Sequence, residues 1–303
     1  MKKKILFIRN ENSYLPEINA YISYFNKTKE FEAYDSSQIN GDSSIDEFDI
    51  IWEFKGLGGY KNSDKIVIHE YSSLSTGHFP RVKNKIKKYY NPKPNLRVFL
   101  NKNVKKEFSF NDGIEYCFRD MGVDKIFTTA NESKKEYEYI YVGEVSKKRK
   151  IDIFLESFCK KPYGKLCMVG SVDDDIFNKY KKNSNLIFTG KVKYNEVPEL
   201  ISKAIFGMNV IPDEYPYNLQ TSTKLIEYLS MGLKVITTDY KWVNEFESAN
   251  MCSFYKIGIN NVDLKDIFDF EYKSNFDSKN YLWDVIFEKS KIKEKLIDLI
   301  NIT

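Results

Sequence analysis

Between residues 139 and 237, short apolar runs alternate with amphipathic segments, and this pattern restricts the fold more than any other feature of the chain. The apolar runs, which have the length of buried strands, are Tyr139–Val142, Lys165–Val169, Leu186–Thr189, Phe206–Ile211 and Lys234–Thr237. The segments between them, which suit helices, are Arg149–Lys160, Asp174–Lys181, Asn195–Lys203 and Ser222–Met231. Strands that alternate with single helices predict a parallel sheet covered by helices on both faces.

The first part of the chain shows a weaker version of the same alternation. Its apolar runs are Lys4–Ile8, Phe48–Phe54, Lys65–Ile68 and Arg97–Leu100, and an amphipathic segment covers Tyr14–Phe25. The polar segment Thr128–Glu138 is predicted to be a linker. We therefore expect an α/β protein of two Rossmann-like domains, 1–130 and 131–280, whose mostly parallel sheets face each other across a cleft. A long helix at Tyr281–Ile300, within the segment 281–303, is expected to cross back to the first domain.

Composition excludes several other classes of protein. Hydrophobic residues make up 42% of the 303 residues, which is enough for a large core. The sequence lacks both a signal-peptide pattern and an apolar window of about 18 residues that could span a membrane. Its four cysteines form no Cys-x-x-Cys pair, which argues against a zinc site. We expect a cytoplasmic protein that can rest on the inner face of a membrane.

The segment after the apolar run that ends at Ile211 combines helix-start signals with charge. Thr221-Ser222-Thr223 supply helix-capping residues, and Gly232 suits the position just after a helix. Lys224 lies in the first turn, where free N–H groups and the helix dipole favour an anion. Glu227 lies three residues further along the same face. This pair suits the phosphates and the ribose of a nucleotide diphosphate, and an ordinary surface ion pair is the alternative.

Three segments of this region form an ordered set. They are Tyr141-Val-Gly143-Glu-Val-Ser-Lys-Lys-Arg149, Asn185-Leu-Ile-Phe-Thr-Gly190-Lys-Val192 and Ser222-Thr-Lys-Leu-Ile-Glu-Tyr-Leu-Ser-Met-Gly232. In this order they resemble the donor site of GT-B glycosyltransferases, in particular glycosyltransferase family 4 of the bacterial polysaccharide and O-antigen type. The resemblance covers about residues 139–237 and is weak over the first domain. It implies the two-domain GT-B fold.

The resemblance also implies a role for each matching residue. Arg149 and Lys224 would bind the donor diphosphate and stabilise it as it leaves, and Glu227 would bind the ribose. The other implied donor-binding residues are Gly143, Gly190, Lys191, Val192, Thr221, Ser222 and Thr223. Two positions depart from the family pattern: Glu144 stands where a basic residue is frequent, and Leu219 stands where a glutamate usually contacts the sugar. Contact with the sugar is therefore assigned to Tyr217, Asn218 and Gln220.

The implied function is that of a hexosyltransferase that retains configuration. The expected donor is a UDP-sugar, with a GDP- or dTDP-sugar as the less favoured choice, and no cofactor or metal is required. The expected acceptor is a surface-polysaccharide intermediate or a lipid-linked glycan. Two alternatives stay open, namely a nucleotide-sugar 2-epimerase of similar fold and a non-catalytic partner subunit, for which Leu219 is the motive.

In the first domain, His69 and Glu70 follow the apolar run that ends at Ile68. Because ligands bind beyond the carboxyl ends of parallel strands, we expect His69 to point into the cleft and to contact the sugar or the acceptor. A structural histidine at the strand end is the alternative. Glu70 is the candidate acceptor-side base of an inverting reaction.

A basic segment follows these two residues. Residues 71–106 contain no Asp or Glu but ten Lys or Arg, whereas the net charge of the whole chain is only +4. The candidate patch comprises Arg81, Lys83, Lys85, Lys87 and Lys88. It suits an anionic membrane surface or a lipid-pyrophosphate acceptor, with a merely solvated surface as the alternative. Nucleic acid is not expected because no binding motif accompanies the charges. Asp173-Asp174-Asp175 is assigned to a helix start and not to a metal.

Overall fold

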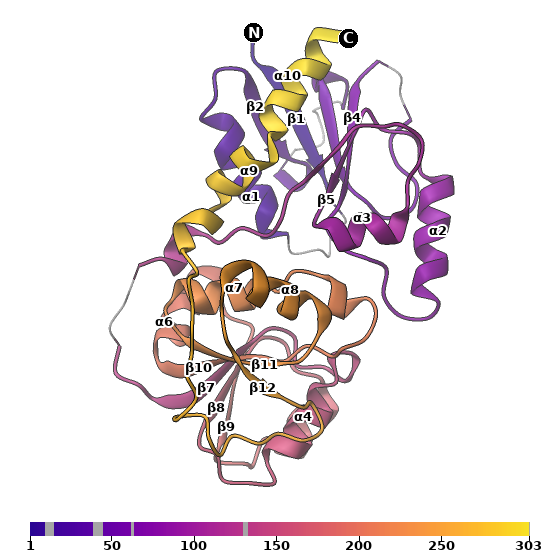
Figure 1. Ribbon diagram of the computed structural model, residues 1–303. Coiled ribbons are helices and arrows are strands. Elements are labelled where there is room, and N and C mark those ends of the chain that lie inside the picture. The colour runs from indigo at the N-terminus through magenta and orange to yellow at the C-terminus, as the bar shows by residue number, and fades with distance from the viewer. Residues whose placement is uncertain (10–14, 39–44, 62–63, 130–132, 303) are drawn as a thin grey trace. The chain divides into compact units, whose positions relative to one another are not determined.

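The protein divides into two compact units, and each is built on its own six-stranded sheet (Figure 1). The computed structural model describes residues 1–9, 15–38, 45–61, 64–129 and 133–302. Unit 1 contains residues 1–122 and 280–303, and unit 2 contains residues 123–279. Residues 130–132 of the predicted linker lie outside the described residues, and its last two residues already belong to the first strand of unit 2.

The sheet of unit 1 is parallel and has the strand order β2-β1-β3-β4-β5-β6. Its strands are β1 (Lys3–Ile8), β2 (Phe31–Asp35), β3 (Ile50–Phe54), β4 (Ile66–Tyr71), β5 (Leu96–Phe99) and β6 (Tyr116–Phe118). The connecting helices are α1 (Pro16–Asn26), α2 (Pro80–Tyr90) and α3 (Lys102–Phe108). The apolar strands bury Ile5, Phe7, Ile50 and Trp52 completely, as suits β1 and β3, which are paired with a strand on both sides.

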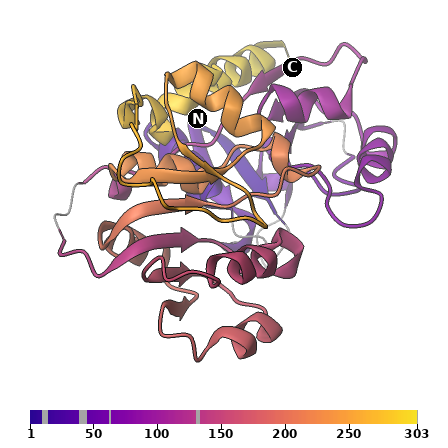
Figure 2. The ribbon, with the colours of Figure 1, turned by 60° about the horizontal axis from the view of Figure 1, so that its bottom comes forward.

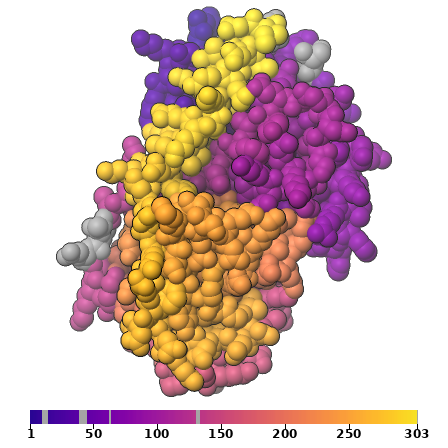
Figure 3. Space-filling model, in the orientation of Figure 1, coloured from indigo at the N-terminus to yellow at the C-terminus, as the bar shows by residue number. Residues whose placement is uncertain are grey.

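The end of the chain completes the core of unit 1. The predicted single helix is in fact two helices, α9 (Trp283–Ser290) and α10 (Ile292–Ile302), because Lys291 between them adopts a left-handed conformation with φ +55°. Phe287 of α9 stacks on Tyr21 of α1 with ring centroids 4.2 Å apart. Figures 1 and 3 show this yellow segment lying along unit 1. Residues 280–303 are therefore an integral part of the unit.

The sheet of unit 2 is also parallel and has the order β12-β11-β10-β7-β8-β9. Its strands are β7 (Tyr137–Val142), β8 (Leu166–Val169), β9 (Leu186–Gly190), β10 (Ala204–Asn209), β11 (Lys234–Thr238) and β12 (Tyr255–Ile257). Its helices are α4 (Ile151–Phe158), α5 (Asp174–Tyr180), α6 (Val197–Ser202), α7 (Thr223–Ser230) and α8 (Lys241–Asn250). The expected alternation of strands and helices is thus confirmed.

The strand order creates a switch point between β7 and β10. From β7 the chain proceeds outward through β8 and β9 and then returns to build β10, β11 and β12 on the other side. Right-handed crossovers place α4 and α5 on one face of the sheet and α6, α7 and α8 on the opposite face, as Figure 2 shows. The loops after β7 and β10 diverge at this point, where open parallel sheets bind ligands.

Candidate functional site

The loops at the switch point pack so closely that they require glycine. Gly143 directly follows β7 and has φ +140°. A Cβ atom on Gly143 would lie 3.3 Å from Nζ of Lys224, and a Cβ atom on Gly170 would lie 2.2 Å from the carbonyl oxygen of Gly143. The first turn of α7 therefore lies directly beside the backbone that leaves β7.

Lys224 lies at this site without a direct ion pair to any described carboxylate. Its Nζ lies 4.2 Å from the centre of the Tyr141 ring, and no described carboxylate lies within 4 Å of it. Burial, assisted by the positive charge of Arg149, lowers the pKa of Lys224 to about 7. An amine held between an aromatic ring and a glycine backbone, with no carboxylate in direct contact among the described residues, suits an incoming phosphate.

Glu227 lies one turn further along α7 and is only 6% exposed. Burial raises the pKa of Glu227 to about 8. The hydroxyl of Tyr194 donates a hydrogen bond to Oε1 of Glu227 at 3.4 Å. The alternative of an ordinary ion pair on a solvated helix is wrong, because this carboxyl is buried and forms no ion pair with Lys224. Sequence reasoning missed Tyr194, although it follows the Gly190-Lys191-Val192 motif by two residues.

Arg149 supplies a second cation near Lys224. It ends the short 3₁₀ turn Lys147–Arg149, so the predicted helix start at Arg149 is wrong and α4 begins at Ile151. Its Nε lies 3.3 Å from Oε2 of Glu144, and its guanidinium carbon lies 5.6 Å from the centre of the Tyr217 ring. Glu144, the departure from the family pattern, therefore pairs with the arginine assigned to the diphosphate.

The start of α7 differs in one respect from the prediction. Ser222 is its N-terminal boundary residue, but the Ser222 side chain does not cap the helix and instead donates to Oδ1 of Asn209 at 2.7 Å. The predicted end of the helix is confirmed. Gly232 has φ +74°, and its N–H group donates to the carbonyl of Leu229 at 3.0 Å, as in a Schellman motif.

The residues assigned to the sugar lie in the turn Tyr217–Leu219 and just after it. Asn218 donates to Oδ1 of Asp213 at 2.9 Å, and Gln220 donates to the carbonyl of Pro216 at 3.3 Å. Their amide groups thus hold the loop itself. Oδ1 of Asn218 is buried and has no hydrogen-bond partner among the described residues.

The remaining donor residues surround this loop or end β9. Thr221 is partly buried just before α7, and Thr223 is the first residue of the helix. Gly190, with φ +71°, ends β9, and a Cβ atom there would meet no atom within 4 Å. Lys191 is exposed and Val192 is partly buried. The segment 190–192 therefore leaves open space beside the strand end.

In unit 1 the structure corrects the expectation for His69. Its ring is completely buried, with Nε2 3.2 Å from Oε2 of Glu53, which also pairs with Lys55 at 3.3 Å. Burial lowers the pKa of His69 below its ordinary value. His69 therefore does not point into open space, because its ring packs among side chains of unit 1, as in the structural alternative.

Glu70 is also placed differently from the expectation. It is fully buried, forms an ion pair with Arg119, and accepts a hydrogen bond from the Trp52 indole at 2.8 Å. Arg119 also lies 3.3 Å from Glu17. A carboxylate enclosed in this way has no access to an acceptor hydroxyl, so the assignment of Glu70 as an acceptor-side base does not fit the structure.

The basic patch lies on α2, of which only Asn84 is buried. Arg81, Lys83, Lys85, Lys87 and Lys88 share this helix with apolar side chains that are exposed to solvent, namely Phe79, Val82, Ile86, Tyr89 and Tyr90. The sequence analysis identified the charges but missed this apolar row. Burial and the neighbouring Lys55 and Lys83 lower the pKa of Lys87, which is therefore the least solvated of the five cations.

Two searches of the described residues gave no site. No described helix combines the length and the apolar character needed to cross a membrane. Within the same ranges, no group of three or more His, Cys, Asp or Glu side chains could hold a metal ion.

Comparison with known proteins gives the class of the protein. Residues 123–254 match the family model described as Glycosyl transferases group 1. No curated protein matches the sequence. A solved glycosyltransferase of avilamycin A biosynthesis is similar over 99% of both chains, with a TM-score of 0.67 and 11% identity.

Two further solved structures share the fold. Anabaena HepE in complex with UDP-glucose covers 99% of this chain and 100% of its own, with a TM-score of 0.67 and 10% identity. A putative UDP-N-acetylglucosamine 2-epimerase from Listeria monocytogenes covers 100% and 98%, with a TM-score of 0.58 and 12% identity. The two Rossmann-like units therefore form a GT-B fold. With its group 1 domain, the protein is a glycosyltransferase whose substrate is a nucleotide sugar.

Proposed function

We propose that the protein transfers a hexose from a UDP-sugar, with retention of configuration, to a surface-polysaccharide intermediate or lipid-linked glycan. The observation that carries this proposal is Lys224 beside Gly143, without a direct ion pair among the described residues, with Arg149 nearby and the buried Glu227 one turn away. Among the solved structures of the same fold, HepE is in complex with UDP-glucose and the Listeria protein is a putative UDP-N-acetylglucosamine 2-epimerase, which favours UDP over GDP or dTDP. Family 4 membership and the O-antigen type of product belong to the same proposal.

In this proposal the donor lies on unit 2 and the acceptor on unit 1. Lys224 and Arg149 bind the diphosphate and stabilise the negative charge that develops as its bond to the sugar breaks. Glu227 accepts hydrogen bonds from the ribose, and the segment 190–192 lines the base. The acceptor oxygen bonds to the anomeric carbon on the face that the diphosphate leaves, and the acceptor proton passes to a diphosphate oxygen. This route needs no protein base, which agrees with the burial of Glu70.

Calorimetry with UDP, GDP and dTDP tests the donor assignment. UDP is expected to bind most tightly, and Lys224→Ala is expected to weaken its binding at least about tenfold, because a charge-assisted phosphate contact contributes about 1.5–3 kcal/mol. Lys182→Ala is the matched control, since Lys182 is exposed on unit 2 and lies outside the site. Equal UDP affinity in Lys224→Ala and wild type would contradict the proposal.

A nucleotide-sugar 2-epimerase is the second candidate, and the Listeria structure of the same fold favours it. Incubation with UDP-glucose or UDP-N-acetylglucosamine in the absence of an acceptor distinguishes the two activities. An epimerase returns an isomeric nucleotide sugar, whereas a transferase releases UDP and requires an acceptor for full turnover. A non-catalytic partner subunit would bind UDP but release no product in either assay.

We also propose that α2 places the enzyme on the cytoplasmic face of an anionic membrane. Phe79 is 78% exposed, and Tyr89 and Tyr90 are each 76% exposed. These residues recur with Val82 and Ile86 at helical spacing and lie among the five cations of the basic patch. Exposed aromatic side chains between lysines are typical of helices that lie in a membrane interface. Residues 71–106 contain no acidic residue. Glu107 of α3 lies 3.7 Å from Arg81, so one acid faces the five cations of the patch.

Vesicle co-sedimentation tests this membrane proposal. Binding is expected to vesicles that contain phosphatidylglycerol but not to pure phosphatidylcholine, and to weaken about fivefold for each lysine removed in Lys85→Gln and Lys88→Gln, since each contributes about 1 kcal/mol. Lys181→Gln with Lys182→Gln is the charge-matched control on unit 2, where both lysines are exposed. If the control pair weakens binding as much as the α2 pair does, the assignment to α2 is wrong.

A further inference from the structure

Asn209, the last residue of β10, lies at the centre of a buried polar network beneath the start of α7. Its side chain is completely buried. Nδ2 of Asn209 donates to Oγ1 of Thr237 and to the hydroxyl of Tyr240, both at 2.9 Å, while Oδ1 accepts from Ser222 at 2.7 Å. Thr237 and Tyr240 are also fully enclosed. Asn209 thereby joins the carboxyl ends of β10 and β11 to the residue before α7.

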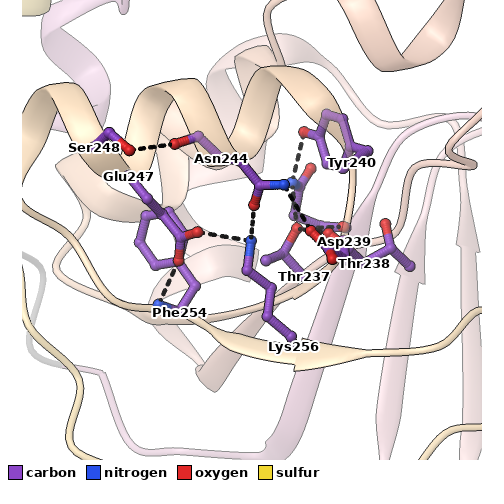
Figure 4. A network of polar contacts seen from close by, with 10 residues as sticks. Thr237, Thr238, Asp239, Tyr240, Asn244, Glu247, Ser248, Phe254 and Lys256 are labelled. Carbon is purple, nitrogen blue, oxygen red and sulfur yellow. Dashed lines mark hydrogen bonds and ion pairs between the residues drawn. The ribbon is translucent and has the colours of Figure 1, made fainter.

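The neighbouring contacts make this network rigid. Thr238 both donates to the carbonyl of Ile211 and accepts from its N–H group at 2.9 Å, so the loop that leads to α7 is fixed at its beginning. Figure 4 shows Thr237, Thr238 and Tyr240 together at the end of β11, where Asn244 of α8 lies next to them. Asn244 is held in turn by Asp239 at 2.8 Å and by Lys256 at 3.0 Å.

This network has a consequence for the N-terminus of α7. A serine at this position normally accepts a hydrogen bond from a backbone N–H group of the first helical turn. The backbone of Ser222 is extended, as capping requires, with φ −89° and ψ 101°, yet the side chain makes no such bond because its hydroxyl is directed to Asn209. The N–H groups of the first turn, where Lys224 lies, therefore have no side-chain cap.

We propose that Asn209 is a positioning residue for the donor diphosphate, because it holds Ser222 away from the N–H groups of α7 that would receive a phosphate oxygen. This inference rests on the proposed donor site and adds a residue that touches neither the sugar nor the nucleotide. Without Asn209, the Ser222 hydroxyl keeps only its contact with the Tyr240 hydroxyl. It can then rotate to cap the helix, where it competes with the phosphate for the same donors.

The test compares UDP binding by calorimetry in wild type, Asn209→Ala, Ser222→Ala and the double variant. Asn209→Ala is expected to weaken UDP binding about tenfold, because a serine N-cap typically changes an equilibrium constant by a factor of about five to ten. Ser222→Ala serves as the reference for the double variant, because it keeps the backbone N–H group assigned to the phosphate and removes only the hydroxyl. The double variant is expected to recover to within about threefold of wild type, because no hydroxyl remains to cap the helix.

A purely structural role predicts the opposite order. If Asn209 only stabilises unit 2, the double variant binds UDP as weakly as Asn209→Ala or more weakly, and the inference is overturned. Thermal unfolding of each variant shows whether it folds. If Asn209→Ala does not unfold cooperatively, Asn209→Ser replaces it. The serine keeps a hydroxyl for Thr237 and Tyr240 but is too short to hold Ser222. Adding Ser222→Ala to this variant is expected to give the same recovery of UDP binding.

The outcome also separates this inference from the proposed function. If wild type binds none of UDP, GDP and dTDP, the donor site itself is refuted. If wild type binds UDP and Lys224→Ala does not, but the double variant shows no recovery, the donor site stands and only the role of Asn209 is refuted.

Discussion

Donor affinity is expected to pass through a maximum between pH 7 and pH 8, because two groups of α7, Lys224 and Glu227, titrate there. In the empty site, burial and the charge of Arg149 lower the pKa of Lys224 to about 7. A bound diphosphate favours the charged amine, so it raises this pKa. Binding therefore takes up a proton above about pH 7, and Lys224 alone would reduce affinity about tenfold per pH unit from there, or about 1.4 kcal/mol per unit.

Glu227 changes donor affinity with pH in the opposite direction to Lys224. Burial raises its pKa to about 8, so the empty site holds a protonated carboxyl at neutral pH. Hydrogen bonds from ribose hydroxyls favour the carboxylate, so binding releases a proton below about pH 8 and affinity rises with pH up to that value. With both groups acting together, donor affinity rises with pH below about pH 7, is nearly constant to about pH 8 and then falls.

Calorimetry with UDP-glucose between about pH 6 and pH 9 measures this profile, and buffers of different ionisation enthalpy count the protons exchanged. Glu227→Gln removes the rising limb and leaves a decline above about pH 7. Lys224→Arg keeps a charge that does not titrate in this range and removes the falling limb. A wild-type affinity that is constant across the range would refute the reasoning, as would identical profiles in both variants.

Three further outcomes follow from the same contacts. Lys224→Met is expected to abolish UDP binding but to raise Tm by about 2–4 °C in a thermal melt, because it removes a desolvated cation at a gain of about 1 kcal/mol. Gly143→Ala is expected to weaken UDP binding at least about tenfold, because its Cβ would lie 3.3 Å from Lys224. In Gly113→Ala, where the glycine also has a positive φ (+75°, against +140° at Gly143) but no neighbour within 4 Å, binding should not change. Glu70→Gln is expected to lower the free energy of unfolding in urea by about 3 kcal/mol, as a broken buried ion pair does. The rate of sugar transfer per folded molecule should stay within about twofold of wild type. A loss of turnover without a loss of stability would restore Glu70 as a base.

The strands and helices of unit 2 could be predicted from sequence because each carries its own apolar period. The short edge strands β6 and β12 were missed. Each has only three residues and pairs on one side only, which is too short for a recognisable hydrophobic period. The strand β2 was missed as well, because Phe31, Ala33 and Asp35 alternate inward over only five residues. The break at Lys291 also escaped prediction, because a left-handed lysine has no sequence signature.

For the candidate site, the sequence predicted which residues lie close together within one segment, but not which distant segments meet. The spacing of Lys224 and Glu227 showed that they share a helical face, but not that Glu227 would be buried against Tyr194. Likewise, the position of Glu70 at a strand end suggested exposure, whereas its partner Arg119 comes from the far end of the unit 1 sequence. Contacts between distant segments decide burial, and burial decides whether a charged residue can meet a substrate.

The division of unit 1 into two chain segments sets the order in which the protein can fold during synthesis. Trp283, Phe287, Ile292 and Leu296 fill the core of unit 1, and all of unit 2 must be translated before they emerge. Unit 2 is continuous and can close its core first. Unit 1 must wait with the faces of Tyr21 and Tyr24 uncovered, so the nascent chain exposes an apolar surface until its last helices arrive. Chaperone capture during translation is therefore expected at α1, and not at unit 2.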